Sequence, residues 1–168
     1  LGVLAKDRGD FEQAAEHYQS ARTLAKTIGN QRSAVFWTLN LGVAHYETGK
    51  WAKALPLLTE GQAQAAARGF RSLEAGATIF IGACHVAQGK EANGLDSIER
   101  GLALAQSIGD QERILIGLLH RGQALAALNR TEEARATLEE GLRQAEASQM
   151  HRMGDYLRAE LEGLPPLS

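Results

Sequence analysis

Residues 41–69 read LGVAHYETGKWAKALPLLTEGQAQAAARG, and the glycines of this stretch recur elsewhere in the chain at intervals of 40 residues. They belong to four series, which are Gly2, Gly42, Gly82 and Gly122; Gly9, Gly49 and Gly89; Gly61, Gly101 and Gly141; and Gly29, Gly69 and Gly109. A period of about 20–50 residues indicates a repeat array. Since four positions recur in one register, the sequence predicts an array of about four repeats.

The composition is that of an ordinary globular protein. Of 168 residues, 44% are hydrophobic and 23% are charged, and the formal net charge is -2. We expect no nucleic-acid partner, because phosphate binding requires clustered Lys and Arg and no dense basic run is present. The longest mostly apolar stretch, residues 75–87, is too short to span a bilayer, so no membrane partner is expected. The single cysteine, Cys84, excludes an internal disulfide and predicts a cytoplasmic location.

Each repeat is predicted to contain two helices separated by tight turns. In the second repeat, residues 33–48 form a helix with two apolar faces, and residues 51–68 form its partner. Glycine takes the left-handed conformation that often follows a helix, and asparagine is the next best choice. The predicted breaks are Gly9-Asp10, Gly49-Lys50, Gly89-Lys90 and Asn129-Arg130, and, after the second helices, Gly29-Asn30, Gly69-Phe70, Gly109-Asp110 and Gln149-Met150. No stretch alternates with a period of two, so no strand is expected.

The second helix of each repeat carries a stripe of three small residues and one large residue. The four stripes are Ala14, Tyr18, Ala21 and Ala25; Ala54, Leu58, Gly61 and Ala65; Gly94, Ile98, Gly101 and Ala105; and Ala134, Leu138, Gly141 and Ala145. A glycine inside a helix costs about 0.5–1 kcal/mol relative to alanine, so we expect close helix packing to offset that cost. Gly101 is expected to touch the first helix of the next repeat.

The chain is predicted to form a single repeat domain over residues 1–168. Its repeats cover approximately residues 1–30, 31–70, 71–110 and 111–149, and a capping helix covers residues 150–163. Eight helices are expected, which are the second half of a truncated first helix, six full helices of about 16–18 residues and the short cap. Leu1-Gly2 matches Leu41-Gly42 inside a helix, which indicates a fragment of a larger protein. The apolar start at residues 1–4 favours end-to-end self-association.

These residues resemble the tetratricopeptide repeat (TPR) family. Its motif pairs two antiparallel helices and carries a Leu-Gly in the first helix, a Gly-Asp-Tyr type of turn and small residues in the second helix. The second repeat matches through Leu41-Gly42, Gly49-Lys50-Trp51, Ala54, Leu58 and Gly61, and the fourth diverges most, at Arg121 and Asn129. The 40-residue period is similar to the long-repeat subgroup of kinesin light chains, Leu-Gly-Asn adaptors and bacterial regulator sensor regions. The resemblance implies an all-α solenoid of antiparallel helix pairs wound into a right-handed superhelix.

The resemblance also implies a concave groove lined by the first helices. Transferring that geometry predicts a partner-binding groove made of Phe36, Leu39, Val43, Tyr46, Glu47, Ile79, Ala83, Val86, Ile116, Leu119 and Gln123. These residues are mostly apolar, which suits a partner helix or an extended apolar peptide. Some members of the family grip a C-terminal carboxylate, but Val3, Leu39 and Val43 occupy the matching places, which argues against that mode. The sequence leaves open whether other parts of a parent protein cover this surface.

No arrangement of residues indicates catalysis or a bound metal, and no cofactor is expected. His45 and His85 lie at equivalent places beside Cys84, but we interpret them as partly buried, hydrogen-bonded histidines, since a metal site needs further ligands. His17, His120 and His151 are expected to be exposed. Glu132-Glu133 and Glu139-Glu140 are interpreted as a solvated face paired with arginines rather than as catalytic carboxylates. The chain is thus predicted not to be an enzyme.

Two functions remain compatible with the sequence. The first is a protein–protein interaction scaffold that binds a partner helix or peptide in its groove. The second is a regulatory region of a larger signalling or transcription-regulator protein, which senses a small ligand or a neighbouring domain. Nearly every patterned residue builds the solenoid, so the sequence does not name the partner.

Overall fold

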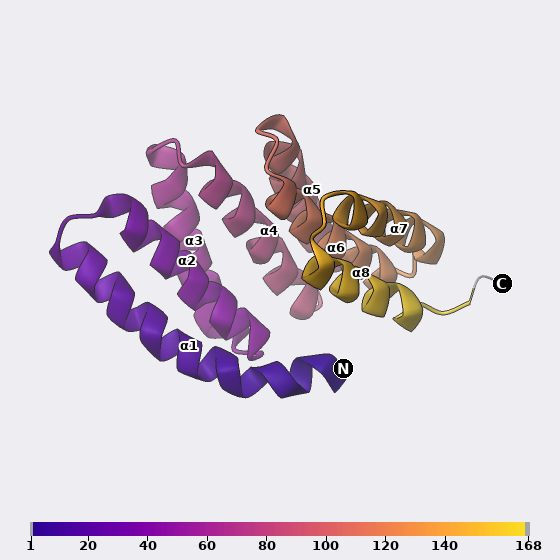
Figure 1. The fold of residues 1–168 in the computed structure, drawn as a ribbon, viewed down its shortest axis with the longest axis horizontal. Helices are drawn as coiled ribbons and strands as arrows, with labels where there is room; N and C mark the ends of the chain where they lie inside the picture. Colours follow the sequence, from indigo (N-terminus) through magenta and orange to yellow (C-terminus); the bar gives the residue numbers. More distant parts are fainter. Residues whose placement is uncertain (1, 167–168) are drawn as a thin grey trace.

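The protein is a single array of helices packed side by side (Figure 1). The computed structural model describes the backbone of residues 2–166 and the side chains of residues 10–166. Within that part of the chain there are eight helices and no strand. The helices are α1 (Gly2–Thr27), α2 (Gln31–Glu47), α3 (Trp51–Ala67), α4 (Arg71–Ala87), α5 (Glu91–Ser107), α6 (Gln111–Ala127), α7 (Thr131–Ala147) and α8 (His151–Gly163). The architecture is the all-α solenoid that the sequence predicts.

The helices α2 to α7 are all of one length, 17 residues, and every linker has three residues. The middle residue of each linker has a positive φ, as at Gly49, where φ is 74°. There the N–H of Lys50 donates to the carbonyl of His45 at 2.8 Å, which closes the end of α2. Asn129 and Gln149 adopt the same conformation, with φ of 59° and 57°. All the predicted breaks from Gly29 onward are therefore confirmed.

The start of the array differs from the prediction. The break expected at Gly9-Asp10 is absent, because α1 runs without interruption from Gly2 to Thr27. Glycine permits a left-handed turn but does not impose one, and a turn at Gly9 would break hydrogen bonds within the helix. Continuation of α1 keeps those hydrogen bonds. The described residues thus hold eight helices, the number expected, whereas the eight predicted breaks delimit nine segments, of which the first two are merged in α1.

The predicted small-residue stripes form the inner faces of the second helices. Ala54, Leu58, Ala65 and their equivalents in α5 and α7 are at most 1% exposed, and the glycines among them are buried. Of the four stripe residues in α1, Ala25 is buried, while Ala14, Tyr18 and Ala21 are half-buried. The stripe is less covered there because, among the described residues, α1 packs against α2 alone, whereas α3 packs against both α2 and α4.

Glycines permit the closest approach within each helix pair. A Cβ placed on Gly82 in α4 would lie 2.6 Å from the carbonyl oxygen of Gly94 in α5, so the two backbones touch directly. A Cβ on Gly101 would lie 2.7 Å from Ile79. Gly101 therefore packs against α4, the preceding helix of its own pair, and the prediction that it touches the next first helix is wrong. The reason is that pairing within the α4–α5 hairpin is tighter than packing between pairs.

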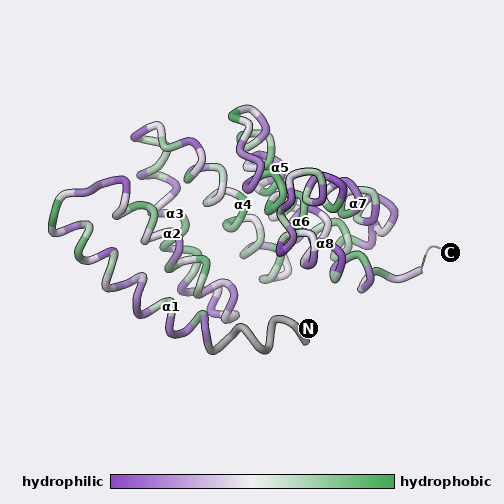
Figure 2. Tube along the Cα trace, viewed as in Figure 1, coloured by the Kyte–Doolittle hydropathy of each residue, from purple (hydrophilic) through white to green (hydrophobic). Residues whose placement is uncertain are grey.

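The C-terminal helix α8 packs onto α6 and α7. Leu157 is fully buried between these helices, whereas Arg158 bridges to Glu146 at 3.3 Å on the outside. Hydropathy along the chain follows the packing, since α1 and α7 carry many hydrophilic residues and α4 carries many hydrophobic ones (Figure 2).

Candidate partner-binding groove

A groove lies between the first helices of three successive pairs, α2, α4 and α6. It encloses about 180 Å³. Its walls come from twelve residues, which are Phe36, Leu39, Asn40, Val43, Leu58, Leu73, Gly76, Ala77, Phe80, Glu112, Arg113 and Ile116. Most of these side chains are apolar, and Phe36 at the rim is 37% exposed although it is a large hydrophobic residue. The groove is thus a hollow, mostly apolar surface of the kind that mediates contacts.

Four of the predicted groove residues line this hollow. Phe36, Leu39 and Val43 come from α2, and Ile116 comes from α6. Leu39 and Val43 are also two of the three places that argued against a carboxylate-binding mode, and both present hydrocarbon to the groove. Val3, the third, lies outside the residues whose side chains the structure describes.

The residues predicted on α4 lie elsewhere. Ile79 and Ala83 are buried in the core, at 0% and 3% exposure, and Val86 packs against Gly94 in α5. The helix α4 presents Gly76, Ala77 and Phe80 to the groove instead. The shift has a physical cause: α4 is packed between α2 and α6 as well as against α3 and α5, so faces that are half-open on α2 are covered on α4.

The remaining predicted residues lie beside the groove rather than in it. Leu119 packs with the core between α6 and α8. Gln123 donates from Nε2 to Glu160 Oε1 at 2.8 Å, and Glu47 is half-buried near the end of α2. Tyr46 packs beyond the end of the hollow against Phe80.

The groove also contains charge that the sequence reasoning missed. Arg113 lines it, and its guanidinium forms an ion pair with the neighbouring Glu112. A Cβ on Gly76 would lie 3.4 Å from Arg113 Nε, so this side chain lies against the bare backbone of α4. On the opposite wall, Asn40 donates from Nδ2 to the carbonyl of Phe36 at 2.8 Å. The charges of Arg113 and Glu112 balance each other and Asn40 is uncharged, so the polar part of the groove is close to neutral.

One end of the groove is closed by a cluster of three rings, Tyr46, Phe80 and His120, which we call the ring cluster. The ring centroids are 5.1 Å apart for Phe80 and His120, 5.6 Å for Tyr46 and Phe80, and 5.7 Å for Tyr46 and His120, and all three pairs meet edge to face. One ring comes from each of α2, α4 and α6. The ring cluster therefore joins the first helices of three successive pairs.

His120 is buried, and the expectation that it is exposed is wrong. It is 6% exposed, and its Nδ1 lies 2.8 Å from Gln123 Oε1. Burial lowers the pKa of His120 to about 4, although the hydrogen bond with Gln123 opposes that shift. Burial also raises the pKa of Tyr46, with Glu47, Cys84 and Glu160 adding to the effect. Both side chains are therefore uncharged at neutral pH.

A pattern in the sequence marks this region. Residues 40, 80, 120 and 160 are one period apart, and each of the four is polar or aromatic in an otherwise apolar helix face. The structure places Phe80 against His120 and connects His120 to Glu160 through Gln123. These four positions, taken together, mark the inner surface of the array more directly than single positions transferred from the family.

The other candidate chemistry has structural explanations. His45 and His85 are half-buried as predicted, but the hydrogen bond expected for His85 is not found at its buried Nδ1, which has no partner among the described residues. Burial raises the pKa of the buried Cys84 thiol to about 12, which leaves it unreactive. His17 and His151 are exposed as predicted. Within residues 10–166, no group of three or more His, Cys, Asp or Glu side chains is placed to hold a metal ion.

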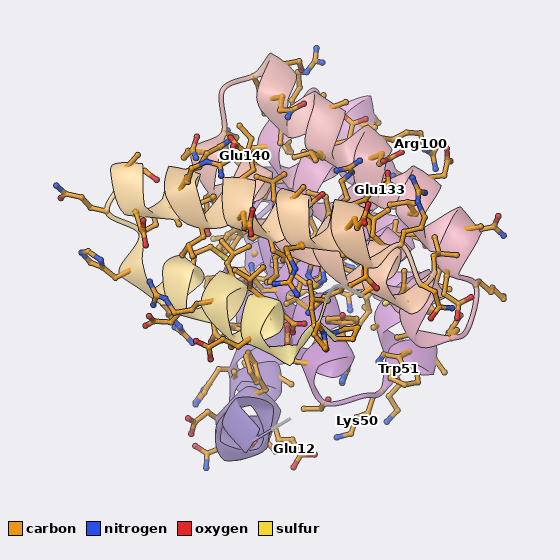
Figure 3. All side chains as sticks on the ribbon, turned by 90° about the vertical axis from the view of Figure 1, so that its right-hand side faces the viewer. Glu12, Lys50, Trp51, Arg100, Glu133 and Glu140 are labelled. Atoms are coloured by element: carbon orange, nitrogen blue, oxygen red, sulfur yellow. The ribbon has the colours of Figure 1, made fainter. Side chains whose placement is uncertain are left out.

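The glutamates of α7 form an exposed, ion-paired face. Arg130 binds Glu133 at 2.7 Å and Arg143 binds Glu140 at 2.5 Å. The hydrogen bond from Arg130 lowers the pKa of Glu133, and the hydrogen bonds from Gln144 and Arg143 lower the pKa of Glu140. Figure 3 shows both glutamates along α7, and Lys50 near Glu12, to which it is paired at 2.7 Å. The interpretation as a solvated, paired face is confirmed for Glu133 and Glu140, whereas Arg135 on the same helix donates to the carbonyl oxygen of Pro165 at 3.0 Å.

Membrane insertion has no support in the helices that the structure describes. None of them combines the length and the apolar character that crossing a bilayer requires.

Comparisons with known proteins address the fold and the family. The tetratricopeptide repeat family model matches residues 116–140, which run from α6 into α7. This is the repeat that diverges most at Arg121 and Asn129, yet it carries the sequence match. No curated protein matches the chain.

Solved structures match nearly the whole chain. One is a set of nearly identical TPR-like repeats from a Podosopora anserina chain assigned as a kinesin light chain, with a TM-score of 0.61 and 15% identity, covering 96% of this chain and 91% of that one. A variant of the same Podosopora anserina repeats matches with the same values. At this identity the likeness concerns the fold alone. The chain thus contains a stretch that matches the tetratricopeptide repeat model, within an array that shares the fold of TPR-like repeats.

Proposed function

We propose that the protein is an interaction scaffold that receives one large apolar side chain of a partner protein in the groove between α2, α4 and α6. The observation that carries the proposal is the groove itself, whose walls are mostly hydrocarbon and whose rim exposes Phe36. An apolar surface of this kind gains free energy when a partner removes it from water.

The size of the groove favours a side chain over a metabolite. Pockets for small molecules and cofactors usually enclose about 300–1,000 Å³. The groove encloses about 180 Å³, which is similar to a cavity that admits a benzene-sized group, roughly 150 Å³. A single large aliphatic or aromatic side chain fits this space, whereas a cofactor does not.

The charge of the groove favours an uncharged partner segment. Arg113 is already balanced by Glu112, and the rest of the lining is apolar apart from Asn40. A carboxylate brought by the partner would have to compete with Glu112 for the guanidinium. The groove therefore complements an apolar anchor flanked by neutral residues.

Selection from a random peptide display library tests the proposal. Peptides that bind the wild-type chain should share one large apolar residue at a fixed position. Gly76→Leu fills the groove from the α4 wall and should weaken these peptides by about tenfold or more. Gly76→Ala is the matched control, since its Cβ makes only ordinary contacts with Arg113, and it should leave binding nearly unchanged.

Three outcomes would contradict the proposal. The library could yield no binder, the selected peptides could bind Gly76→Leu as well as they bind the wild type, or a small metabolite could stabilise the chain while no peptide does. The last result would support the ligand-sensing alternative. Circular dichroism of each variant establishes that the fold is kept.

A further inference from the structure

The ring cluster is linked to the C-terminal helix by a continuous chain of hydrogen bonds. Glu160 on α8 accepts from Gln123 Nε2 at 2.8 Å, and Gln123 Oε1 lies 2.8 Å from His120 Nδ1. The amide of Gln123 is thus fixed at both ends, which orients its oxygen toward the imidazole. With an amide oxygen as partner, Nδ1 of the neutral His120 is the donor.

The same cluster forms part of the groove wall. Phe80 lines the hollow and also meets the rings of Tyr46 and His120. A displacement of His120 therefore has a direct steric route to Phe80. Tyr46 belongs to α2 and His120 to α6, so the cluster also sets how closely these two helices approach at the closed end of the groove.

We propose that α8 controls the shape of the groove through Glu160, Gln123, His120 and the ring cluster. The inference rests on the proposed function in one respect, since it assigns regulation to the same binding surface. When α8 is seated, Glu160 holds Gln123 and His120 in place, and the rings keep α2 and α6 together. A domain or partner that shifts α8 then loosens the closed end of the groove without touching the bound segment.

Packing supports this direction of control. The seat of α8 on α6 and α7 is apolar at Leu157, which is fully buried, while its outer side is charged and accessible at Arg158. A partner can reach that outer side while the groove stays open. The hydrogen-bonded chain is half-buried at Gln123 and Glu160 and buried at His120, so its bonds are little weakened by solvent.

Spin labels on α6 and on α3, which packs against α2, test the geometric part. Lys53→Cys on α3 and Ala127→Cys on α6 are exposed sites for the pair of labels, and Cys84 is too buried and too weakly acidic to react. Glu160→Ala should widen the distribution of distances between the labels. Glu162→Ala, an exposed site on the same helix, and Glu160→Gln, which keeps an acceptor oxygen for Gln123, should leave the distribution as in the wild type.

The peptides selected for the groove test the regulatory part. Glu160→Ala should weaken them by about threefold to tenfold, as is typical of coupling through packed side chains, while both control variants bind normally. If Glu160→Ala does not fold, Gln123→Met replaces it, because methionine keeps the length of the side chain and removes both hydrogen bonds.

An unchanged label distribution in a folded Glu160→Ala protein would overturn the inference, and so would a widened distribution with unchanged peptide affinity. If no peptide binds the wild type at all, the proposed function fails. The label distances then still decide whether α8 sets the shape of the groove.

Discussion

The most consequential single residue is His120, because the sequence offers little reason to expect its burial. It stands among apolar residues on α6 and contacts rings from two other helices. His120 is buried because three helices meet around it, so the sequence of α6 alone does not predict its burial. The repeat register predicts that Tyr46 lies in the groove. In the structure Tyr46 packs beyond the end of the groove against Phe80, a contact between helices that the register does not contain.

His120 makes stability depend on pH. Its pKa in the folded chain is about 4, below the usual 6.5, so the unfolded chain binds the proton first as the pH falls. The contribution of neutral His120 to the free energy of unfolding is fully present above pH 6.5. It is lost as the pH falls toward 4, by up to about 3 kcal/mol. Urea unfolding of the wild type and of His120→Phe between pH 4.5 and 7 measures it. A parallel decline in the two proteins would contradict the assignment.

At the scale of the helix, two glycines of α4 have opposite roles. A Cβ on Gly82 would meet the backbone of α5 at 2.6 Å, whereas a Cβ on Gly76 would meet only Arg113 at 3.4 Å. We predict that Gly82→Ala destabilises the protein by about 1–3 kcal/mol through overpacking. Gly76→Ala should stabilise it by about 0.5–1 kcal/mol, because alanine favours the helix.

Thermal unfolding followed by circular dichroism compares the same substitution at the two sites. Equal melting temperatures for the two variants would mean that α4 and α5 are not in backbone contact. A loss of stability in Gly76→Ala alone would reverse the assignment of the two faces of α4.

The ends of the helices offer a second comparison. Gln149 has a φ of 57° at the place where five other linkers have glycine. Left-handed geometry costs an ordinary L-residue about 1–2 kcal/mol, so Gln149→Gly should stabilise the chain by roughly 0.5–1 kcal/mol.

The matched change in the opposite direction is Gly109→Ala, where φ is 67° and which should cost about 1 kcal/mol. The midpoint of urea denaturation measures both. A decrease for Gln149→Gly would show that its side chain makes a compensating contact.

For the whole molecule, the sequence predicted what repeats and missed what depends on position in the array. The turns from Gly29 onward recur along the array, and the buried stripe of α3 recurs in α5 and α7, because the same helix contacts repeat there. The face of α4 differs from that of α2 because a central helix has neighbours on both sides, which a transfer by 40 residues ignores. The merged α1 differs because Gly9 permits a turn without imposing one, so a glycine at the repeating position does not by itself end a helix.

The equal lengths of the helices and linkers have a consequence for how such a chain can grow. Residues 71–110 begin and end at equivalent points of two left-handed turns, so this block can be copied or deleted without altering the length of any helix. Each copy of the block would keep the backbone contact between Gly82 and Gly94, because both residues lie within it. The copy number of the module, rather than any new kind of turn, then sets how many grooves the molecule can offer.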